Sequence, residues 1–239
     1  MSAYPPGPLN PAGPAQSEYL IHFCGRAPGL SFTSSVPDGI RKIAPAQRLD
    51  SILWQQCIWG FPPFGAASPM VCFSESPLDH LAWLINERHW PSWGVILTRQ
   101  WVYAAGGGPA WYARPEQYGR MTADQPAWSV RLGTSWDQPR SEWLHEREWR
   151  LPVPAESPCL RLPPGVISAV LVGDPSWQPS VRPVPQPTGH YVDVSSGHRA
   201  QPDDPLAQPE MRQVPAYPPL WGTYPRWYWE PGQHRLVAV

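Results

Sequence analysis

Proline is the feature that most constrains how this chain can fold. Of its 239 residues, 35 are proline, and they are spread along the whole sequence. Each proline fixes one backbone dihedral and removes one amide donor, which breaks a helix interior and interrupts a strand ladder. The sequence therefore predicts short elements joined by rigid loops and argues against long helices.

Short apolar runs mark where those elements are expected. Strands are predicted over residues 18–24, 69–77, 93–98, 110–113, 144–151 and 166–173. Two helices are predicted: residues 45–59, because Leu49, Ile52 and Leu53 recur at helical spacing, and residues 78–86. The strands do not alternate with helices as βαβ units would. The fold class expected is α+β, with a mainly antiparallel sheet, few short helices and long Pro-rich loops.

The chain is long enough for one domain with extensions. Residues 1–17, rich in Pro, Gly and Ala, are expected to be a disordered tail. Residues 18–173 are expected to form the domain, and residues 174–239 a Pro/Trp-rich extension packed on it. Whether that extension folds alone, packs back or stays extended is open at this point.

Charge and cysteine usage exclude several protein classes. The formal charge of -1 gives no overall attraction to nucleic acid or anionic membrane, although a local basic groove remains open. The cysteines have no metal-site spacing, so neither a zinc site nor any other metal site is predicted; they are Cys24, Cys57, Cys72 and Cys159. We expect reduced thiols. With no apolar run long enough for a membrane span and no signal-peptide pattern at the start, a cytoplasmic protein is expected.

Charged residues, only 15% of the chain, concentrate in residues 141–151. Read as a strand, this stretch places Glu146, Glu148 and Arg150 on one face. In a cleft, one carboxylate could hold a sugar hydroxyl or stabilise a developing cation, while the other accepts a proton from a nucleophile. The alternative is a solvated edge strand in which Glu148 and Arg150 form a surface pair.

A second polar cluster lies where the strand at residues 69–77 leads into the helix at 78–86. Ser76 is predicted to cap that helix, with Pro77 as its first residue. Ser74, Ser76 and the free amides of the helix would then face one spot, suited to a phosphate or a carboxamide. The alternative is an ordinary capped helix. His80, further along this helix, is expected to face solvent.

The order His22, then Ser74 and Ser76, then Glu146 and Glu148 resembles the three-part motif of the ADP-ribosyltransferase superfamily. The arrangement of IHF, VCFSESPL, GGGPAWY and EREWR also resembles a bacterial domain family of AbiGi-type abortive phage infection, with DarT-type enzymes as more distant relatives. The likeness covers residues 19–173 and implies an ADP-ribosyltransferase-like split sheet.

The resemblance implies NAD as substrate and no metal. Glu148 would hold the nicotinamide ribose and Glu146 would act on the acceptor. The NAD-binding residues implied are His22, Phe23, Arg26, Ser74, Ser76, Tyr103, Tyr112 and Arg150. The paired tyrosines that sandwich nicotinamide in the family are missing, and Tyr103, Trp111 and Tyr112 are their expected substitutes.

Three functions fit this pattern. The first is an ADP-ribosyltransferase or, with water as acceptor, an NAD glycohydrolase, in a toxin or phage-defence setting. The second is a nucleic-acid-modifying enzyme of the DarT kind; a basic groove is then expected at Arg26, Arg41, Lys42 and Arg48. The third is a catalytically inactive, antitoxin-like interaction protein that binds through its C-terminal region. The acceptor, nucleic acid or protein, is left open.

Overall fold

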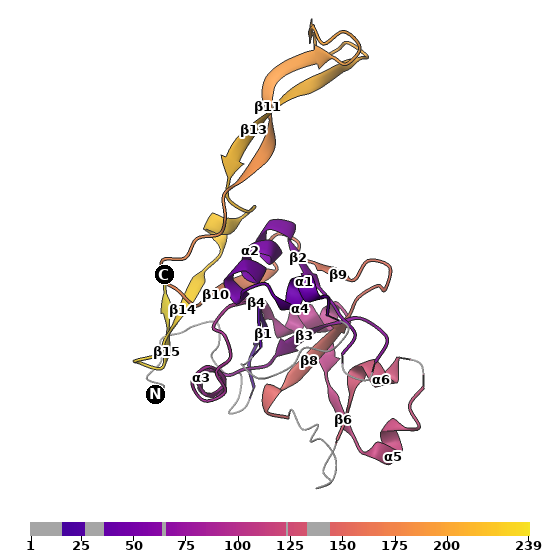
Figure 1. The fold of residues 1–239 in the computed structure, drawn as a ribbon, viewed down its shortest axis with the longest axis vertical. Helices are drawn as coiled ribbons and strands as arrows, with labels where there is room; N and C mark the ends of the chain where they lie inside the picture. The colour runs from indigo at the N-terminus through magenta and orange to yellow at the C-terminus, as the bar shows by residue number, and fades with distance from the viewer. Residues whose placement is uncertain (1–15, 27–35, 64–65, 123, 133–143) are drawn as a thin grey trace. The chain divides into compact units, whose positions relative to one another are not determined.

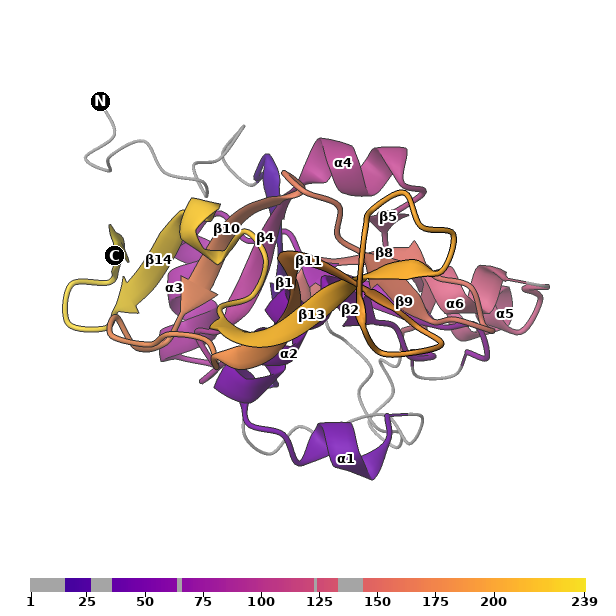
Figure 2. The ribbon, with the colours of Figure 1, turned by 90° about the horizontal axis from the view of Figure 1, so that it is seen from above.

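A computed structural model describes residues 16–26, 36–63, 66–122, 124–132 and 144–239. Most of the predicted N-terminal tail, residues 1–15, lies outside the described residues. The fold is α+β around one large, mainly antiparallel sheet, which confirms the predicted class. The eight strands lie in the order β15-β14-β10-β4-β1-β3-β8-β5, and only β10 and β14 pair in parallel. Figure 2 shows this sequence of strands from β14 on one side to β8 and β5 on the other.

The strands of the large sheet come from both ends of the chain. Their bounds are β1 Tyr19–Phe23, β3 Met70–Ser74, β4 Gly94–Thr98, β5 Gly108–Pro109, β8 Glu148–Pro152, β10 Ile167–Val172, β14 Arg226–Glu230 and β15 Arg235–Ala238. Two small sheets accompany it. They pair β2 (Cys57–Trp59) with β9 (Cys159–Arg161) and β6 (Trp111–Ala113) with β7 (Ser129–Arg131).

The helices are short, as the prolines predict. They are α1 Asp38–Arg41, α2 Pro45–Gln55, α3 Leu78–Asn86, α4 Arg99–Ala104, α5 Pro115–Tyr118 and α6 Gln125–Trp128, with 3-10 turns η1 Leu144–Glu146 and η2 Trp221–Thr223. The prediction of a helix to residue 59 is wrong. Gln56 adopts a left-handed backbone with φ of 48°, which ends α2, and the chain continues as β2.

The two faces of the large sheet carry different cores. On one face, Ile21, Ile96, Ala169 and Leu171 pack with Leu81 of α3 in a fully buried cluster. On the other, Leu20, Val95, Leu97 and Val170 are equally buried. Since successive strand residues alternate between faces, this alternation also decides which polar side chains meet.

The C-terminal region does not form one extension. Residues 222–239 belong with the N-terminal part of the chain, where β14 and β15, yellow in Figure 1, complete the large sheet. Residues 178–221 form a separate compact unit. A domain boundary at residue 173 would thus separate strands that share one sheet.

That separate unit is a two-stranded ribbon with a short third strand. β11 (Arg182–Asp193) pairs antiparallel with β13 (Ala207–Ala216), and β12 (Arg199–Ala200) pairs with the C-terminal end of β11. Figure 1 shows β11 and β13 side by side in orange and yellow. None of residues 180–217 is buried.

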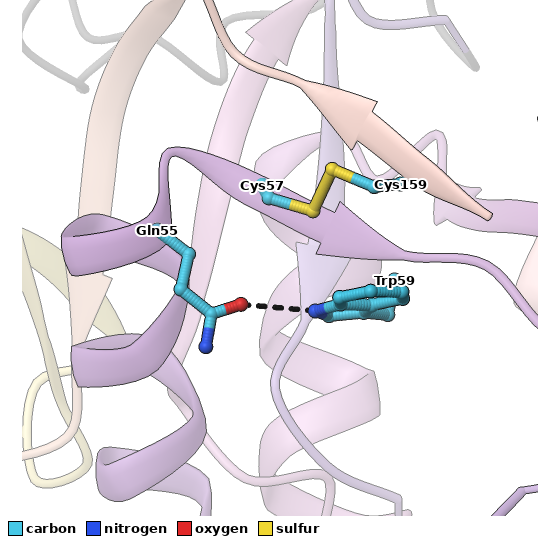
Figure 3. Close-up of a disulfide and its surroundings, with 4 residues drawn as sticks. All are labelled: Gln55, Cys57, Trp59 and Cys159. Atoms are coloured by element: carbon cyan, nitrogen blue, oxygen red, sulfur yellow. Dashed lines mark hydrogen bonds between the residues drawn. A yellow bond between two sulfur atoms is a disulfide. The ribbon is translucent and has the colours of Figure 1, made fainter. Parts of the chain in front are cut away.

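A disulfide joins the strands of one small sheet. Cys57 of β2 is bonded to Cys159 of β9, and beside it the Trp59 indole donates a hydrogen bond to Gln55 (Figure 3). The prediction of reduced thiols is wrong for this pair, because antiparallel pairing brings together two cysteines that lie 102 residues apart. Cys24 and Cys72 are free thiols.

Candidate functional site

The pairing of β3 with β8 brings the two predicted polar clusters together. Ser74 lies directly opposite Glu148, and Cys72 lies opposite Arg150. Directly opposite residues of an antiparallel pair share a face, so these four side chains lie on the same side of the sheet. This is the face that carries Ile21 and that α3 covers, because Ile21 is the partner of Ser74 in β1.

Glu146 reaches this face by a route that strand periodicity did not predict. It ends the turn η1, and Arg147 then adopts a left-handed backbone with φ of 47° before β8 begins at Glu148. The prediction that residues 144–147 continue a strand is therefore wrong. The charge of Glu148 nevertheless raises the pKa of Glu146, so the two carboxylates lie within electrostatic reach of each other.

The two carboxylates have different surroundings. Burial raises the pKa of Glu146 to about 7, with Glu148 adding to the rise and Arg26, Arg150 and Arg88 opposing it. One carboxylate oxygen, Oε1, is buried and has no hydrogen-bond partner in the part of the chain that the structure describes. Glu146 can therefore gain or lose a proton near neutral pH.

Glu148, in contrast, is held in an ion pair. Its Oε2 accepts a hydrogen bond of 2.8 Å from Nη2 of Arg150, whose side chain is almost fully buried. Nη1 of Arg150 also donates to the carbonyls of Ala127, at 2.6 Å, and Ser129, at 3.2 Å. Burial by itself lowers the pKa of Arg150, but the Glu148 carboxylate beside it outweighs burial and the pKa is raised. Arg150 therefore keeps its proton and its positive charge beside the Glu148 carboxylate.

A chain of hydrogen bonds joins the serines to the turn that carries Glu146. Ser74 Oγ donates to the Glu146 carbonyl at 2.6 Å and lies 2.8 Å from Ser76 Oγ. Ser76 Oγ lies 3.1 Å from Nδ1 of His80, and Nε2 of His80 donates to the His145 carbonyl at 2.6 Å. Two predictions fail here. The residue before α3 is Pro77 rather than Ser76, and His80 is partly buried instead of facing solvent.

His22 lies on the opposite face of the sheet from Ser74 and Glu148. Its ring contacts that of Phe73, the neighbour of Ser74 that points the other way, with centroids 5.9 Å apart. Its Nδ1 lies 2.9 Å from the Cys72 carbonyl, and burial lowers its pKa. His22 is therefore not brought together with the two glutamates, as its predicted role requires.

The other predicted residues divide in the same way. Arg26, four residues beyond His22, is exposed, and its charge lowers the pKa of Glu146. Of the two basic residues in the first motif region, Arg26 and not His22 therefore acts on Glu146. Tyr112 lies close enough to Arg150 to influence its pKa. Phe23 packs edge-on against Trp90. Tyr103 is 70% exposed on α4, and Trp111 is 49% exposed and stacks on Trp128.

Two contributors escaped sequence reasoning. His80 stands four residues after Ser76, a spacing that places two helical side chains on one face, and this was the available signal. Arg88 lies with its guanidinium 5.6 Å from the centre of the Trp83 ring and its charge acts on Glu146. Nothing in the local sequence around Arg88 indicates that contact.

No cluster of three or more His, Cys, Asp or Glu side chains that could hold a metal is found within the described ranges. Likewise, none of the described helices is long and apolar enough to cross a membrane. No family model, no curated protein and no solved structure matches this chain.

Proposed function

We propose that this protein cleaves the nicotinamide–ribose bond of NAD and transfers ADP-ribose to an acceptor, or to water. The observation that carries the proposal is the pair of unlike carboxylates, Glu146 and Glu148, beside Ser74 on one face of the sheet. Such pairs suit glycosidic chemistry, in which one acid stays ionised and the other exchanges a proton.

In this proposal the ion-paired Glu148 stays charged. It accepts a hydrogen bond from a hydroxyl of the nicotinamide ribose and stabilises positive charge as the C–N bond breaks. Nicotinamide leaves with the bonding electron pair. The acceptor's oxygen or nitrogen then bonds to the ribose carbon, and its proton passes to the ionised Glu146. Arg26 and Arg88, whose charges reach Glu146, would attract the pyrophosphate.

The test is release of nicotinamide from NAD by the purified full chain, followed by NMR, alone and with added DNA, RNA or cell lysate. Release in buffer makes the protein a glycohydrolase, and release only with one macromolecule identifies the acceptor class. Glu148→Gln is expected to reduce the rate at least 100-fold. His22→Gln is the matched control and is expected to keep most of the rate. Full activity of Glu148→Gln would contradict the proposal.

The setting, a toxin or phage-defence role in a bacterial cytoplasm, rests on the family resemblance. Disulfides are rare in a reducing cytoplasm. A count of free thiols in the unfolded protein, purified with its thiols blocked at lysis, tests the setting. Four thiols fit a cytoplasmic protein. Two thiols fit the Cys57–Cys159 bond and an oxidising compartment.

A second candidate, the antitoxin-like interaction protein, is favoured by the ribbon of β11 and β13. Its register pairs Pro183 with Pro215 and Pro187 with Met211, so these side chains share one face with Pro185. Just beyond the pairs, Val181 and Tyr217 are 50% and 49% exposed, and Met211 is 51% exposed. An isolated two-stranded ribbon is marginally stable, so a partner covering this apolar ribbon face would stabilise it.

The ribbon edges indicate how a partner would bind. Pro183, Pro185 and Pro187 recur at alternate positions of β11, so their missing N–H groups all fall on the same side of the strand. If that side faced β13, the ladder would lack three successive donors. The backbone nitrogens of the prolines therefore point away from β13. An edge without donors does not accept an added strand, and a partner is expected to bind the apolar ribbon face.

A photo-crosslinking residue placed at Met211, with Arg212 on the opposite face as control, tests this second candidate in living cells. A binder is expected to give one specific adduct from position 211 and much less from position 212. Equal labelling from both positions would contradict face-specific binding.

A further inference from the structure

We propose that His80 is a positioning residue, which clamps the turn carrying Glu146 through two main-chain carbonyls, and that the clamp is complete only when His80 is protonated. The geometry of the clamp stands independently of any activity. Its consequence for catalysis rests on the function proposed above.

The clamp is built from the short contacts of α3 and β3 with the turn η1. His80 holds the turn directly, because its Nε2 donates to the His145 carbonyl at 2.6 Å. It also holds the next carbonyl, that of Glu146, through the hydroxyls of Ser76 and Ser74. Two successive carbonyls of one turn are thus fixed from one imidazole, and the Glu146 side chain leaves the chain at the Cα atom between these two carbonyls.

Counting hydrogens shows what this network needs. It contains four contacts: His145 carbonyl to His80, His80 to Ser76, Ser76 to Ser74, and Ser74 to the Glu146 carbonyl. Carbonyl oxygens only accept, so every hydrogen must come from the imidazole or the hydroxyls. A neutral imidazole and two hydroxyls supply three hydrogens in either tautomer. One contact therefore lacks a hydrogen until the imidazole takes up a second proton.

The surroundings of His80 decide when that proton is bound. The ring faces Ser76 at the start of its own helix, the Trp83 ring stacked against it 5.9 Å away, and the turn carrying His145, Glu146 and Arg147. Burial lowers the pKa of His80, the His145 carbonyl raises it, and the charges of Arg147 and His145 lower it further. At neutral pH the imidazole is therefore neutral and the clamp is one hydrogen short.

Acidification changes both partners of this device. Glu146, whose pKa is about 7, gains its proton first, and His80 follows at lower pH. Above neutral pH, Glu146 is an ionised base on a turn held by three hydrogens. Once the pH falls below the lowered pKa of His80, Glu146 is an acid on a turn held by four. The clamp therefore gains its fourth hydrogen only at a pH at which Glu146 is already protonated.

The experiment uses NMR of the full chain between pH 4.5 and 8, in the Glu146→Gln background so that the carboxyl itself does not titrate. The imidazole nitrogens of His80 are expected to report hydrogen on Nε2 alone at pH 8 and on both nitrogens at low pH. The amide signals at positions 145–147 are expected to move with the same midpoint as the His80 ring. Hydrogen exchange of the position 147 amide, which is bonded to the Leu144 carbonyl, is expected to slow about fivefold once corrected for pH.

Two variants separate the parts of the clamp. Ser76→Ala in the same background is expected to abolish the pH response at position 146 while keeping that at position 145. His198→Gln, at an exposed histidine of the separate ribbon, is the control and is expected to change neither. The clamp would be overturned if the amide signals at positions 145–147 did not shift with the titration midpoint of the His80 ring. An unchanged response at position 146 in Ser76→Ala would overturn it as well. A coupled titration without any NAD cleavage would overturn the proposed function alone.

Discussion

Two carboxylates near the same end of β3 have opposite surroundings: Glu75 directly follows the strand, and Glu146 ends a turn whose carbonyl accepts a hydrogen bond from Ser74. Glu75, directly after β3, is 8% exposed, and its two oxygens accept hydrogen bonds from the Ser17 amide, Arg99 and the Trp149 indole. Glu146 has a buried oxygen with no hydrogen-bond partner among the described residues. The first carboxylate joins the residue two positions before β1, the start of α4 and β8; the second is left available to exchange a proton.

This difference distinguishes a carboxylate that stabilises the fold from one that can exchange a proton. A buried carboxylate whose oxygens are all occupied stabilises the native state only as long as its partners remain. A buried carboxylate with an unoccupied oxygen costs stability when ionised, and such groups concentrate at functional sites. Variants at each acid should therefore change stability with opposite signs.

The largest loss in the free energy of unfolding is expected from removing Arg150, the cation beside Glu148. Arg150→Met leaves Glu148 buried without its partner and leaves the carbonyls of Ala127 and Ser129 without a donor. The free energy of unfolding should fall by about 3–5 kcal/mol. Urea denaturation followed by fluorescence measures it. A loss below about 1 kcal/mol would mean that the ion pair does not hold this face together.

Glu75→Ala is expected to cause the second largest loss in the free energy of unfolding, after Arg150→Met. It leaves the Trp149 indole and the Ser17 amide without their acceptor and Arg99 without one of its carboxylates. The expected loss is about 2–4 kcal/mol in the same denaturation experiment. NAD cleavage per folded molecule should persist, since Glu75 faces away from Glu148. A stable Glu75→Ala variant would remove the contrast between the two acids.

Glu146→Gln is expected to increase stability. The folded-state pKa of about 7 lies above the ordinary glutamate value of 4.5, so the native state binds more protons between these values. The contribution of Glu146 is fully present below pH 4.5 and is lost as pH rises through 7, by about 3 kcal/mol at most. At pH 8 the variant should be about 1–3 kcal/mol more stable than the parent, and the advantage should vanish near pH 4.5. A destabilised variant at pH 8 would contradict the unpartnered acid.

The smallest effect is expected at a surface pair away from both acids. Arg235 and Glu230 form an ion pair of 3.4 Å between β15 and the end of β14, with half of the Arg235 side chain exposed. Arg235→Gln should change the free energy of unfolding by about 0.5 kcal/mol or less. A larger change would indicate that exposed pairs matter here as much as the buried ones.

Local pattern predicted most of the central strands of the large sheet and its two longest helices. The β-branched run at residues 166–173 became β10, the helix at 78–86 became α3, and the proline content agreed with short helices. The family resemblance grouped Ser74 with the two glutamates, and the pairing of β3 with β8 sets Ser74 directly opposite Glu148.

Long-range pairing decided the rest. Which face His22 occupies depends on the register of β1 against its neighbours, and shifting by one residue exchanges the faces. The left-handed Arg147 interrupts the period on which the placement of Glu146 was based. His80 donates to the carbonyl of His145, 65 positions away, which no local window can include.

The central claim, that Glu146 is an unpartnered acid beside an ionised Glu148, is tested most directly by a carboxyl ¹³C NMR titration of the full chain. The glutamate carboxyl carbons are assigned by comparing the parent with Glu146→Gln. The account predicts that the signal lost in the variant titrates with a midpoint near pH 7. A midpoint near 4.5, the value of an exposed glutamate, would contradict it.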